Sequence, residues 1–429
     1  MQDLTSPSRP SPGVWFAFMV LVFVSSIVVL RPTGDEAATA TPSPGASATP
    51  SSSQRPVDLI EQALDAQSAA LLSGDLPGWL APVDPKLQAR YTTIFQNLRE
   101  LEVTHAEQRM DAMPTAYSDM LTVSIKLAYC FSDVVCPAWK DATDEGAPKL
   151  AYRTSWQLLE GSYKITKLEE FRGFNHLQPT PWEKDPMTFA HGKRVIVAAP
   201  AATARYVKRV LPLAEKAAVV ADRYAGYGGN QQKKYRVFIA DNKAWDTWYG
   251  GMDSEYAVAY HFSLNSTGGD IVLKASELMP EEDRVVAQVI QHEFAHAVTL
   301  VAQVNDDKVD DLWLVEGIAE YIGYLPAKPQ NSYSREVLRY VRSQRGPLKT
   351  IRVAPLTDES DDIDSAALYA TGHFAAGCMA AKYGEPKMLD FADRVLQYGE
   401  ELDSASRAVF GKPFPAVDKE CVAWIKSKI

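Results

Sequence analysis

Two short segments that read as buried helices carry the residues that most constrain this fold. The first, VIQHEFAHAVTLV at 289–301, places His292 and His296 four residues apart, on one face of a helix. Glu293 then points about 100° away around the same helix. The segment is apolar nearly all round, and ionisable groups buried there are costly without partners. A metal ion held by both imidazoles would satisfy them, whereas a chance match would leave them unpaired.

The second segment, DDLWLVEGIAEYIGYL at 310–325, carries Glu316 and Glu320 on one face of an apolar helix. A tetrahedral zinc site with an open position needs three protein ligands. The sequence after His296, AVTLVAQVND, lacks the glycine and histidine of the metzincin pattern. We therefore predict that Glu316 is the third ligand of a Zn²⁺ ion. Glu320 would hydrogen-bond a ligand imidazole; the alternative is that it is a surface acid.

The pair of motifs resembles the gluzincin zinc metallopeptidases, and most closely their peptidase-MA-like branch. HEFAH is followed, after nineteen residues, by the glutamate of WLVEGIAEY. The resemblance covers about 185–429 and implies a zincin-like domain that hydrolyses peptide bonds in a peptide or protein substrate. It also implies that Glu293 is the general base for a zinc-activated water. The exopeptidase motif of the aminopeptidase branch is absent, and 263–275 is the expected edge strand that would hold the substrate backbone.

Related gluzincins supply a tyrosine or histidine from a later helix to stabilise the oxyanion of the reaction. Here the apolar segment 365–384 offers Tyr369 and His373, again four residues apart. We favour Tyr369 as the donor, with His373 as the second choice, which would act best when protonated. The alternative for Tyr369 is that it is a packed core aromatic.

The N-terminus predicts a location outside the cytoplasm. Residues 14–30 form an apolar run, which we interpret as an uncleaved transmembrane anchor or a signal segment, preceded by a cytoplasmic stretch at 1–13. Residues 31–56 are rich in Ala, Ser, Thr and Pro, as is typical of a linker. The protein is thus expected at the cell membrane, attached through 14–30, with its folded part extracytoplasmic, or secreted if the segment is cleaved.

The overall fold class predicted is α+β, in two domains. Residues 57–175 read as helix followed by antiparallel strands, with a hairpin turn at 160–162. This pattern resembles the cystatin-like fold of the nuclear-transport-factor-two-like superfamily and implies a binding or spacer role. The Pro-rich segment 175–186 is the predicted boundary.

The second domain is predicted to begin with a strand–helix–strand unit. The strands are RVIVAAP at 194–200 and YRVFIAD at 235–241, and the helix between them spans 201–226. A small mixed sheet would then lie beside a helical half, with the site in the cleft between them.

Four cysteines are typical of an oxidising compartment. Cys130 and Cys136 are separated by a hairpin-sized gap, and Cys378 and Cys421 lie in two expected helices of the second domain. We predict these two disulfides among the three possible pairings; the alternative is four buried thiols.

Charge excludes one class of partner. The net charge of −10 argues against nucleic-acid binding. Acidic runs at 305–311 and 358–364 could hold calcium, but neither has a calcium-loop spacing, so solvated loop acids are the favoured interpretation.

The sequence is compatible with two functions. One is an active zinc peptidase, and the other is a non-cleaving binding or sensor protein on the same fold. A purely structural zinc would need no base, so Glu293 favours the first.

Overall fold

The computed structural model describes residues 55–117, 119–131, 135–141, 145–169, 177–228, 231–252, 257–264, 268–300, 311–357 and 359–429. The proposed anchor at 14–30 and nearly all of the linker lie outside these residues. None of the described helices is long and apolar enough to cross a membrane. The fold is a mixture of helices and two separate sheets, which agrees with the predicted α+β class.

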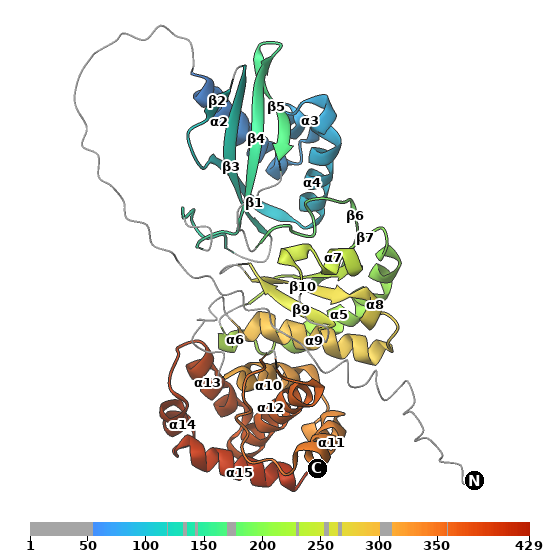
Figure 1. Ribbon diagram of the computed structural model, residues 1–429, viewed down its shortest axis with the longest axis vertical. Helices are drawn as coiled ribbons and strands as arrows, with labels where there is room; N and C mark the ends of the chain where they lie inside the picture. Colours follow the sequence, from blue (N-terminus) through green and yellow to red (C-terminus); the bar gives the residue numbers. More distant parts are fainter. Residues whose placement is uncertain are drawn as a thin grey trace, which may run out of the picture.

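The N-terminal part packs helices against an antiparallel sheet (Figure 1). Its helices are α2 (Pro56–Ser73), α3 (Leu76–Leu80), η1 (Pro85–Leu87) and α4 (Gln88–Glu100). Its strands are β1 (Val103–Met110), β2 (Thr115–Tyr117), β3 (Met120–Phe131), β4 (Lys149–Leu159) and β5 (Ser162–Glu169). They pair in the order β1-β3-β4-β5, with β2 beside β3. The predicted hairpin is confirmed: β4 and β5 are joined at Glu160 and Gly161, both with positive φ, as a tight hairpin turn requires.

A second, mixed sheet lies in the middle of the molecule (Figure 1). Its strands run in the order β6-β7-β8-β10-β9, and the three inner strands are mutually parallel. The strands are β6 (Met187–His191), β7 (Val195–Pro200), β8 (Tyr235–Ala240), β9 (Ala259–Ser263) and β10 (Gly269–Lys274). Helix α5 (Val207–Ala221), entered through η2 (Ala204–Tyr206), connects β7 to β8, as the predicted strand–helix–strand unit requires.

The prediction of an edge strand within 263–275 is wrong. The strand in that segment, β10, lies inside the sheet between β8 and β9. The edge strand on this side of the sheet is β9, which precedes β10 in the sequence and contacts α9 (Asp283–Thr299). Strand order depends on how distant segments connect, so the apolar pattern of β10 cannot reveal which neighbour closes the sheet.

Both faces of the central sheet are buried, because its strands alternate apolar side chains between two cores. One face packs on α5 and α9 through residues that include Val197, Val237, Ile239, Ile271 and Leu273. The other face packs on the N-terminal part, and its cluster includes Phe238, Tyr260, Phe262, Tyr129, Phe131 and Trp182. The sheet is therefore shared between the two halves of the chain.

The predicted boundary segment takes part in this junction. Leu177 and Trp182 are fully buried. The side-chain amide of Asn97 in α4 donates hydrogen bonds of 2.9 Å to the carbonyls of Trp182 and Asp185. The described part of the segment, 177–186, is thus fixed to the N-terminal helices.

A helical half completes the fold below the sheet (Figure 1). It consists of α10 (Leu312–Gly323), α11 (Ser334–Arg345), α12 (Asp362–Tyr383), α13 (Glu385–Leu396), α14 (Leu402–Phe410) and α15 (Phe414–Lys426). Short helical turns elsewhere are α6 (Ala225–Gly228), α7 (Asn242–Trp245), η3 (Trp248–Gly250), α8 (Ala275–Leu278) and η5 (Pro329–Asn331). Asp361, in the acidic run 358–364, caps α12 in a capping box with Asp364. Arg345 pairs with both aspartates, so these acids already have partners.

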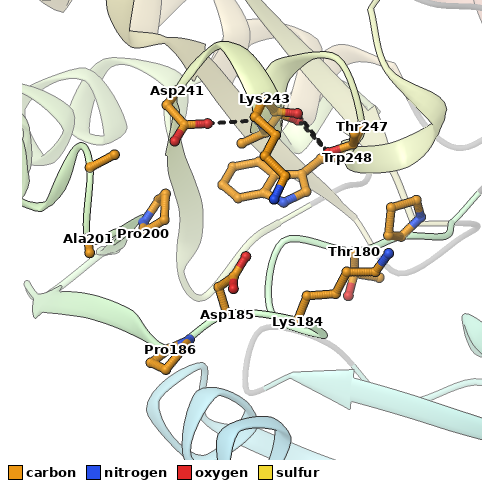
Figure 2. A pocket seen from close by; sticks show the side chains of 13 residues that line it. Thr180, Lys184, Asp185, Pro186, Pro200, Ala201, Asp241, Lys243, Thr247 and Trp248 are labelled. Carbon is orange, nitrogen blue, oxygen red and sulfur yellow. Dashed lines mark hydrogen bonds between the residues drawn. The ribbon is translucent and has the colours of Figure 1, made fainter. Parts of the chain in front are cut away.

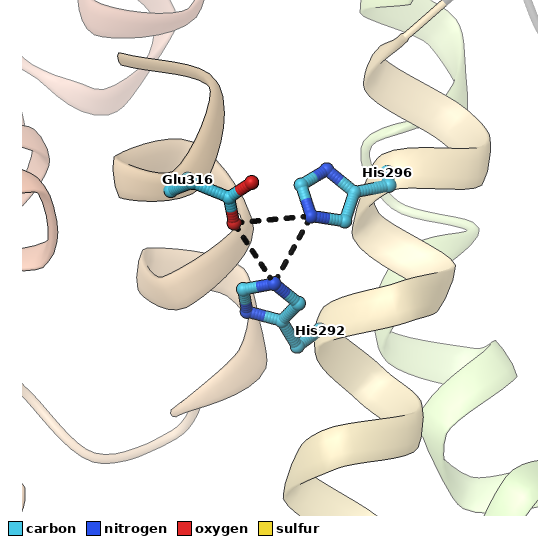
Figure 3. Close-up of side chains that lie close together, drawn as sticks. All are labelled: His292, His296 and Glu316. Carbon is cyan, nitrogen blue, oxygen red and sulfur yellow. Dashed lines mark hydrogen bonds and ion pairs between the residues drawn. The ribbon is translucent and has the colours of Figure 1, made fainter. Parts of the chain in front are cut away.

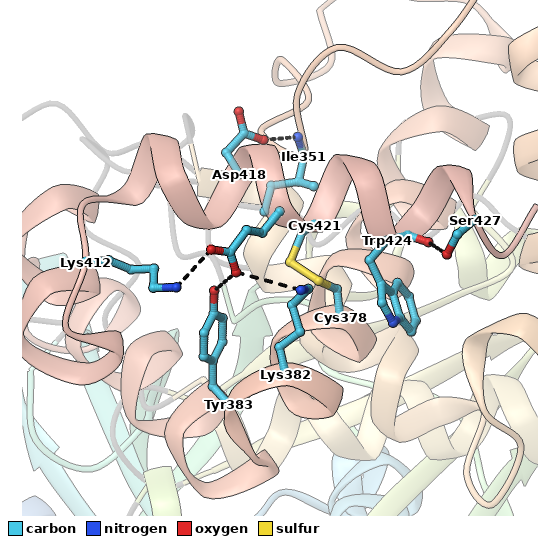
Figure 4. The surroundings of a disulfide bond; sticks show 10 residues. Ile351, Cys378, Lys382, Tyr383, Lys412, Asp418, Cys421, Trp424 and Ser427 are labelled. Atoms are coloured by element: carbon cyan, nitrogen blue, oxygen red, sulfur yellow. Dashed lines mark hydrogen bonds and ion pairs between the residues drawn. A yellow bond between two sulfur atoms is a disulfide. The ribbon is translucent and has the colours of Figure 1, made fainter.

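Both predicted disulfides are confirmed. Cys130 pairs with Cys136 and Cys378 with Cys421, each with Cα atoms 5.6 Å apart. The second bond joins α12 to α15 in the middle of the helical half (Figure 4). Helix α12, which carries Tyr369 and His373, is thereby covalently tied to the C-terminal helix.

One buried ion pair lies at the junction of the two halves. Arg236 Nε of β8 is 2.6 Å from Asp270 Oδ1 of β10, and the two side chains are 2% and 1% exposed. The Tyr249 hydroxyl donates to the other oxygen of Asp270. The Arg236 guanidinium also lies over the ring of Phe131, at 4.6 Å from its centroid.

We predict that Asp270→Asn lowers the free energy of unfolding by about 3–5 kcal/mol, because it leaves the Arg236 charge buried without its counter-charge. Asp283→Asn is the matched control: it removes an Arg–Asp pair of similar length, 2.8 Å, in which Asp283 is 65% exposed. That change should cost less than about 1 kcal/mol. Denaturant unfolding of both variants measures the difference, and equal losses would contradict the prediction.

Candidate metal centre

Helix α9 presents two imidazoles to one point. His292 and His296 lie one turn apart, and their Nε2 atoms are 3.0 Å apart (Figure 3). Each side chain is only 1% exposed. The helix begins at Asp283, whose negative charge interacts favourably with the positive end of the helix dipole. The apolar residues of α9 pack against the central sheet and fix the helix there.

Glu316 of α10 completes a triangle with the two histidines. Its Oε2 atom lies 3.3 Å from Nε2 of His292 and 3.3 Å from Nε2 of His296 (Figure 3). Ligands about 2.0–2.1 Å from a tetrahedral zinc ion are themselves about 3.3 Å apart. The three side chains therefore fit zinc in donor type and in spacing, with one position left for water.

The backbones of α10 and α12 are in contact beside this triangle. A Cβ atom added to Gly317 would lie 2.6 Å from the carbonyl oxygen of Gly372. A Cβ added to Gly372 would lie 2.5 Å from the carbonyl oxygen of Trp313. Glycine at both positions thus allows the close approach that places Glu316 in the core.

The end of α10 is tied to α9 by Gln291, the residue before the first histidine. Its side-chain amide donates to the carbonyls of Ile322, Gly323 and Leu325 at 2.6, 3.1 and 3.1 Å. These carbonyls lie at and just beyond the C-terminal end of α10, so the amide caps the helix. The interaction fixes the register of α10 against His292.

Glu293 lies in the same buried region but on another face of α9. It is 1% exposed, and its Oε1 atom has no hydrogen-bond partner among the described residues. Burial raises its pKa, while His292, His296 and a backbone hydrogen bond from His261 of β9 act in the opposite direction; the net effect is a raised pKa. A carboxylate with a raised pKa is a stronger base than an exposed one.

Glu320 lies behind His292. Its Oε1 atom is 3.1 Å from Nδ1 of His292, on the side of the ring opposite the triangle, and the carboxyl group is 1% exposed. Burial raises the pKa of Glu320. A carboxylate at this position fixes the tautomer and the ring orientation of the imidazole.

The charges of the triangle are strongly coupled. Burial alone would lower the pKa of His292, but hydrogen bonds to Glu316 and Glu320 raise it well above its ordinary value. Burial alone would raise the pKa of Glu316, but His296 and His292 lower it. The protonated triangle is thus a cationic imidazole held by carboxylates, and a bound cation would replace the proton.

The two candidate oxyanion donors lie in different surroundings. The Tyr369 ring is 1% exposed, and its centroid is 6.3 Å from that of His292. His373 is fully buried on the far side of Glu320, with Nδ1 2.9 Å from Ser334 Oγ and 4.0 Å from Glu320 Oε2. Burial lowers the pKa of His373 to about 3, so the protonated form considered from the sequence is not populated at neutral pH.

The sequence patterns indicated no role for His261, Gln291 or Ser334. His261 is one of only seven histidines, and that rarity was the signal available for it. Its Nε2 atom is buried and has no hydrogen-bond partner among the described residues. The other two residues are common polar types, and their roles depend on contacts with distant helices.

A separate cavity of about 430 Å³ lies at the junction of the two halves, where β7 and β8 end (Figure 2). None of the residues of the triangle lines it. Its wall includes Lys184, Asp185, Asp241, Lys243 and Trp248. The wall carries two lysines and two aspartates, so its charge favours neither an anion nor a cation.

We predict that the full-length protein binds one equivalent of zinc and that His296→Ala reduces the bound zinc to background, because two ligands remain of three. His191→Ala is the control, since His191 is a half-exposed histidine that pairs with Glu100 at 2.7 Å. Elemental analysis after dialysis measures both variants. Full zinc occupancy in His296→Ala would remove this site from consideration.

Comparison with known proteins adds no assignment to this geometry. No family model matches the chain, and a search of curated proteins finds no match either.

Proposed function

We propose that the protein is an extracytoplasmic zinc-dependent metallopeptidase that hydrolyses peptide bonds. The observation that carries this proposal is the triangle of His292, His296 and Glu316, with edges of 3.0 to 3.3 Å, beside the buried carboxyl group of Glu293. Three ligands with an open position are typical of catalytic rather than structural zinc. A structural site would not need an additional buried acid.

The proposed roles follow from position and chemistry. When bound, zinc would lower the pKa of its water to about 7 and polarise the scissile carbonyl group. Glu293 takes a proton from the attacking water and passes it to the leaving amine. Glu320 keeps His292 in the tautomer whose Nε2 atom is free to bind the metal.

Tyr369 is the proposed donor to the oxyanion. Its ring centroid lies 6.3 Å from that of His292, whereas His373 approaches the Glu320 carboxylate instead, with Nδ1 4.0 Å from Oε2. A preorganised donor at this position would stabilise charge that develops only in the transition state. Peptides or proteins are the proposed substrates.

The proposed location rests on two observations. The two disulfides support an oxidising compartment. The apolar run 14–30, followed by the Ala/Ser/Thr/Pro-rich stretch to residue 56, supports attachment to a membrane at a distance from its surface. Nucleic acid is not among the proposed partners, because the net charge is −10.

Glu293→Gln should lower turnover by at least about 10²-fold and leave zinc content unchanged, because the amide cannot accept the proton from water. Glu282→Gln is the control, since it neutralises an exposed acid at the start of the same helix. Digestion of a peptide library with both variants measures the effect. Zinc binding by a wild-type protein that cleaves nothing would favour the binding or sensor alternative.

Tyr369→Phe should lower kcat by about 10²–10³-fold with little change in KM, because it removes a donor that acts in the transition state. Tyr383→Phe is the matched control: it removes a hydroxyl from the same helix, one that binds Glu420 at 2.7 Å (Figure 4). At saturating zinc, His373→Gln should lose far less than Tyr369→Phe. The reverse order in steady-state kinetics would make His373 the donor and Tyr369 a packing residue.

A further inference from the structure

A second group of buried polar side chains lies behind the proposed metal ligands. It consists of Glu320 of α10, Tyr324 just after α10, Ser334 of α11 and His373 of α12. Glu320, Ser334 and His373 are no more than 1% exposed. Burying polar groups costs free energy unless they serve one another, so their grouping calls for an explanation.

The contacts of this group lead from α11 to the metal-binding histidine. Ser334 Oγ lies 2.9 Å from His373 Nδ1, and that nitrogen lies 4.0 Å from Glu320 Oε2. The other oxygen of Glu320, Oε1, lies 3.1 Å from His292 Nδ1. One carboxylate thus faces the proposed ligand with one oxygen and His373 with the other.

Tyr324 closes the group on its remaining side. Its ring stacks on His373, with centroids 4.7 Å apart and planes 20° apart. Its hydroxyl takes part in a hydrogen bond with Ser334. The imidazole of His373 is therefore held by a ring on its face and by a hydroxyl on its edge, and it cannot turn without disturbing both.

We propose that His373, fixed by Ser334 and Tyr324, is a positioning residue that holds the Glu320 carboxylate on His292 and so sets the orientation of the metal-binding imidazole. This inference rests on the proposed zinc site and deepens it. His373 acts on the metal through Glu320 and does not contact substrate. The Glu320 carboxylate cannot rotate away from His292 while His373 occupies the space beside its second oxygen.

The test measures zinc affinity by competition with a chelator, and the visible absorption of the Co²⁺-substituted protein. Removing groups that orient a metal ligand typically costs about 10–100-fold in metal affinity. We expect His373→Phe to lower zinc affinity by about 10-fold or more and to shift the Co²⁺ spectrum. His373→Asn, which keeps a polar atom near the position of Nδ1, should recover part of the loss.

Thr371→Val is the matched control. Thr371 is fully buried two residues before His373 on the same helix, and its hydroxyl has no hydrogen-bond partner among the described residues. It should leave zinc affinity and the spectrum unchanged. Thermal unfolding of the metal-free variants shows whether His373→Phe disturbs folding. If it does, Ser334→Ala tests the same group of side chains with a smaller truncation.

A double-mutant cycle with Glu320→Gln separates positioning from general packing. Because His373 acts through Glu320, His373→Phe should have little further effect on zinc affinity once Glu320 is changed. Additive losses, or an unchanged zinc affinity in His373→Phe, would overturn the inference. A fall in kcat with unchanged zinc affinity would instead make His373 the oxyanion donor.

The outcome also separates this inference from the proposed function. A wild-type protein that binds no zinc would remove both. A wild-type protein that binds zinc and loses turnover in Glu293→Gln, while zinc affinity in His373→Phe and Ser334→Ala equals that of wild type, would remove the positioning role alone.

Discussion

The structure depends on burying several ionisable groups within one helical core. His292, Glu293, His296 and Glu316 are all at most 1% exposed, and none could be kept there singly without a large cost in free energy. Opposite charges and shared protons make the group tolerable, and a divalent cation would replace the proton at its centre. The helices around it are placed accordingly: α9 and α10 supply the groups, and α12 packs against α10 closely enough to require glycine at the contact.

Among the described residues, two groups of buried ionisable side chains lie on opposite faces of the same sheet. The histidine-rich group lies on the side of α9, and the Arg236–Asp270 pair faces the N-terminal part. In the first, Oε1 of Glu293 has no hydrogen-bond partner among the described residues. The second is closed, since Tyr249 satisfies the remaining oxygen of Asp270. This difference supports a chemical role for the first and a structural role for the second.

The spacing of residues along the sequence predicted those features that depend only on short segments of the chain. Residues four apart on a helix share a face whatever the rest of the chain does, so the positions of His292 and His296, and of Glu316 and Glu320, followed from spacing. The strand–helix–strand unit, the hairpin and the Cys130–Cys136 disulfide were predicted for similar reasons, whereas the Cys378–Cys421 disulfide was predicted because both cysteines belong to the second domain. Three features could not be predicted in this way: the neighbours of β10, the neutral state of His373, and the contact of His373 with Ser334. Each depends on segments that are brought together only by tertiary packing.

Because the central sheet is shared, the two halves of the chain cannot easily be exchanged separately during evolution. Modules that are recombined during evolution carry their own complete cores and meet through exchangeable surfaces. Here Phe238, Tyr260 and Phe262 belong by sequence to the half with the proposed metal site but are covered by Tyr129 and Trp182 from outside it. Neither half is a free module in this sense. A lineage that exchanged the N-terminal part would have to supply a new aromatic cover of the same shape at the same time.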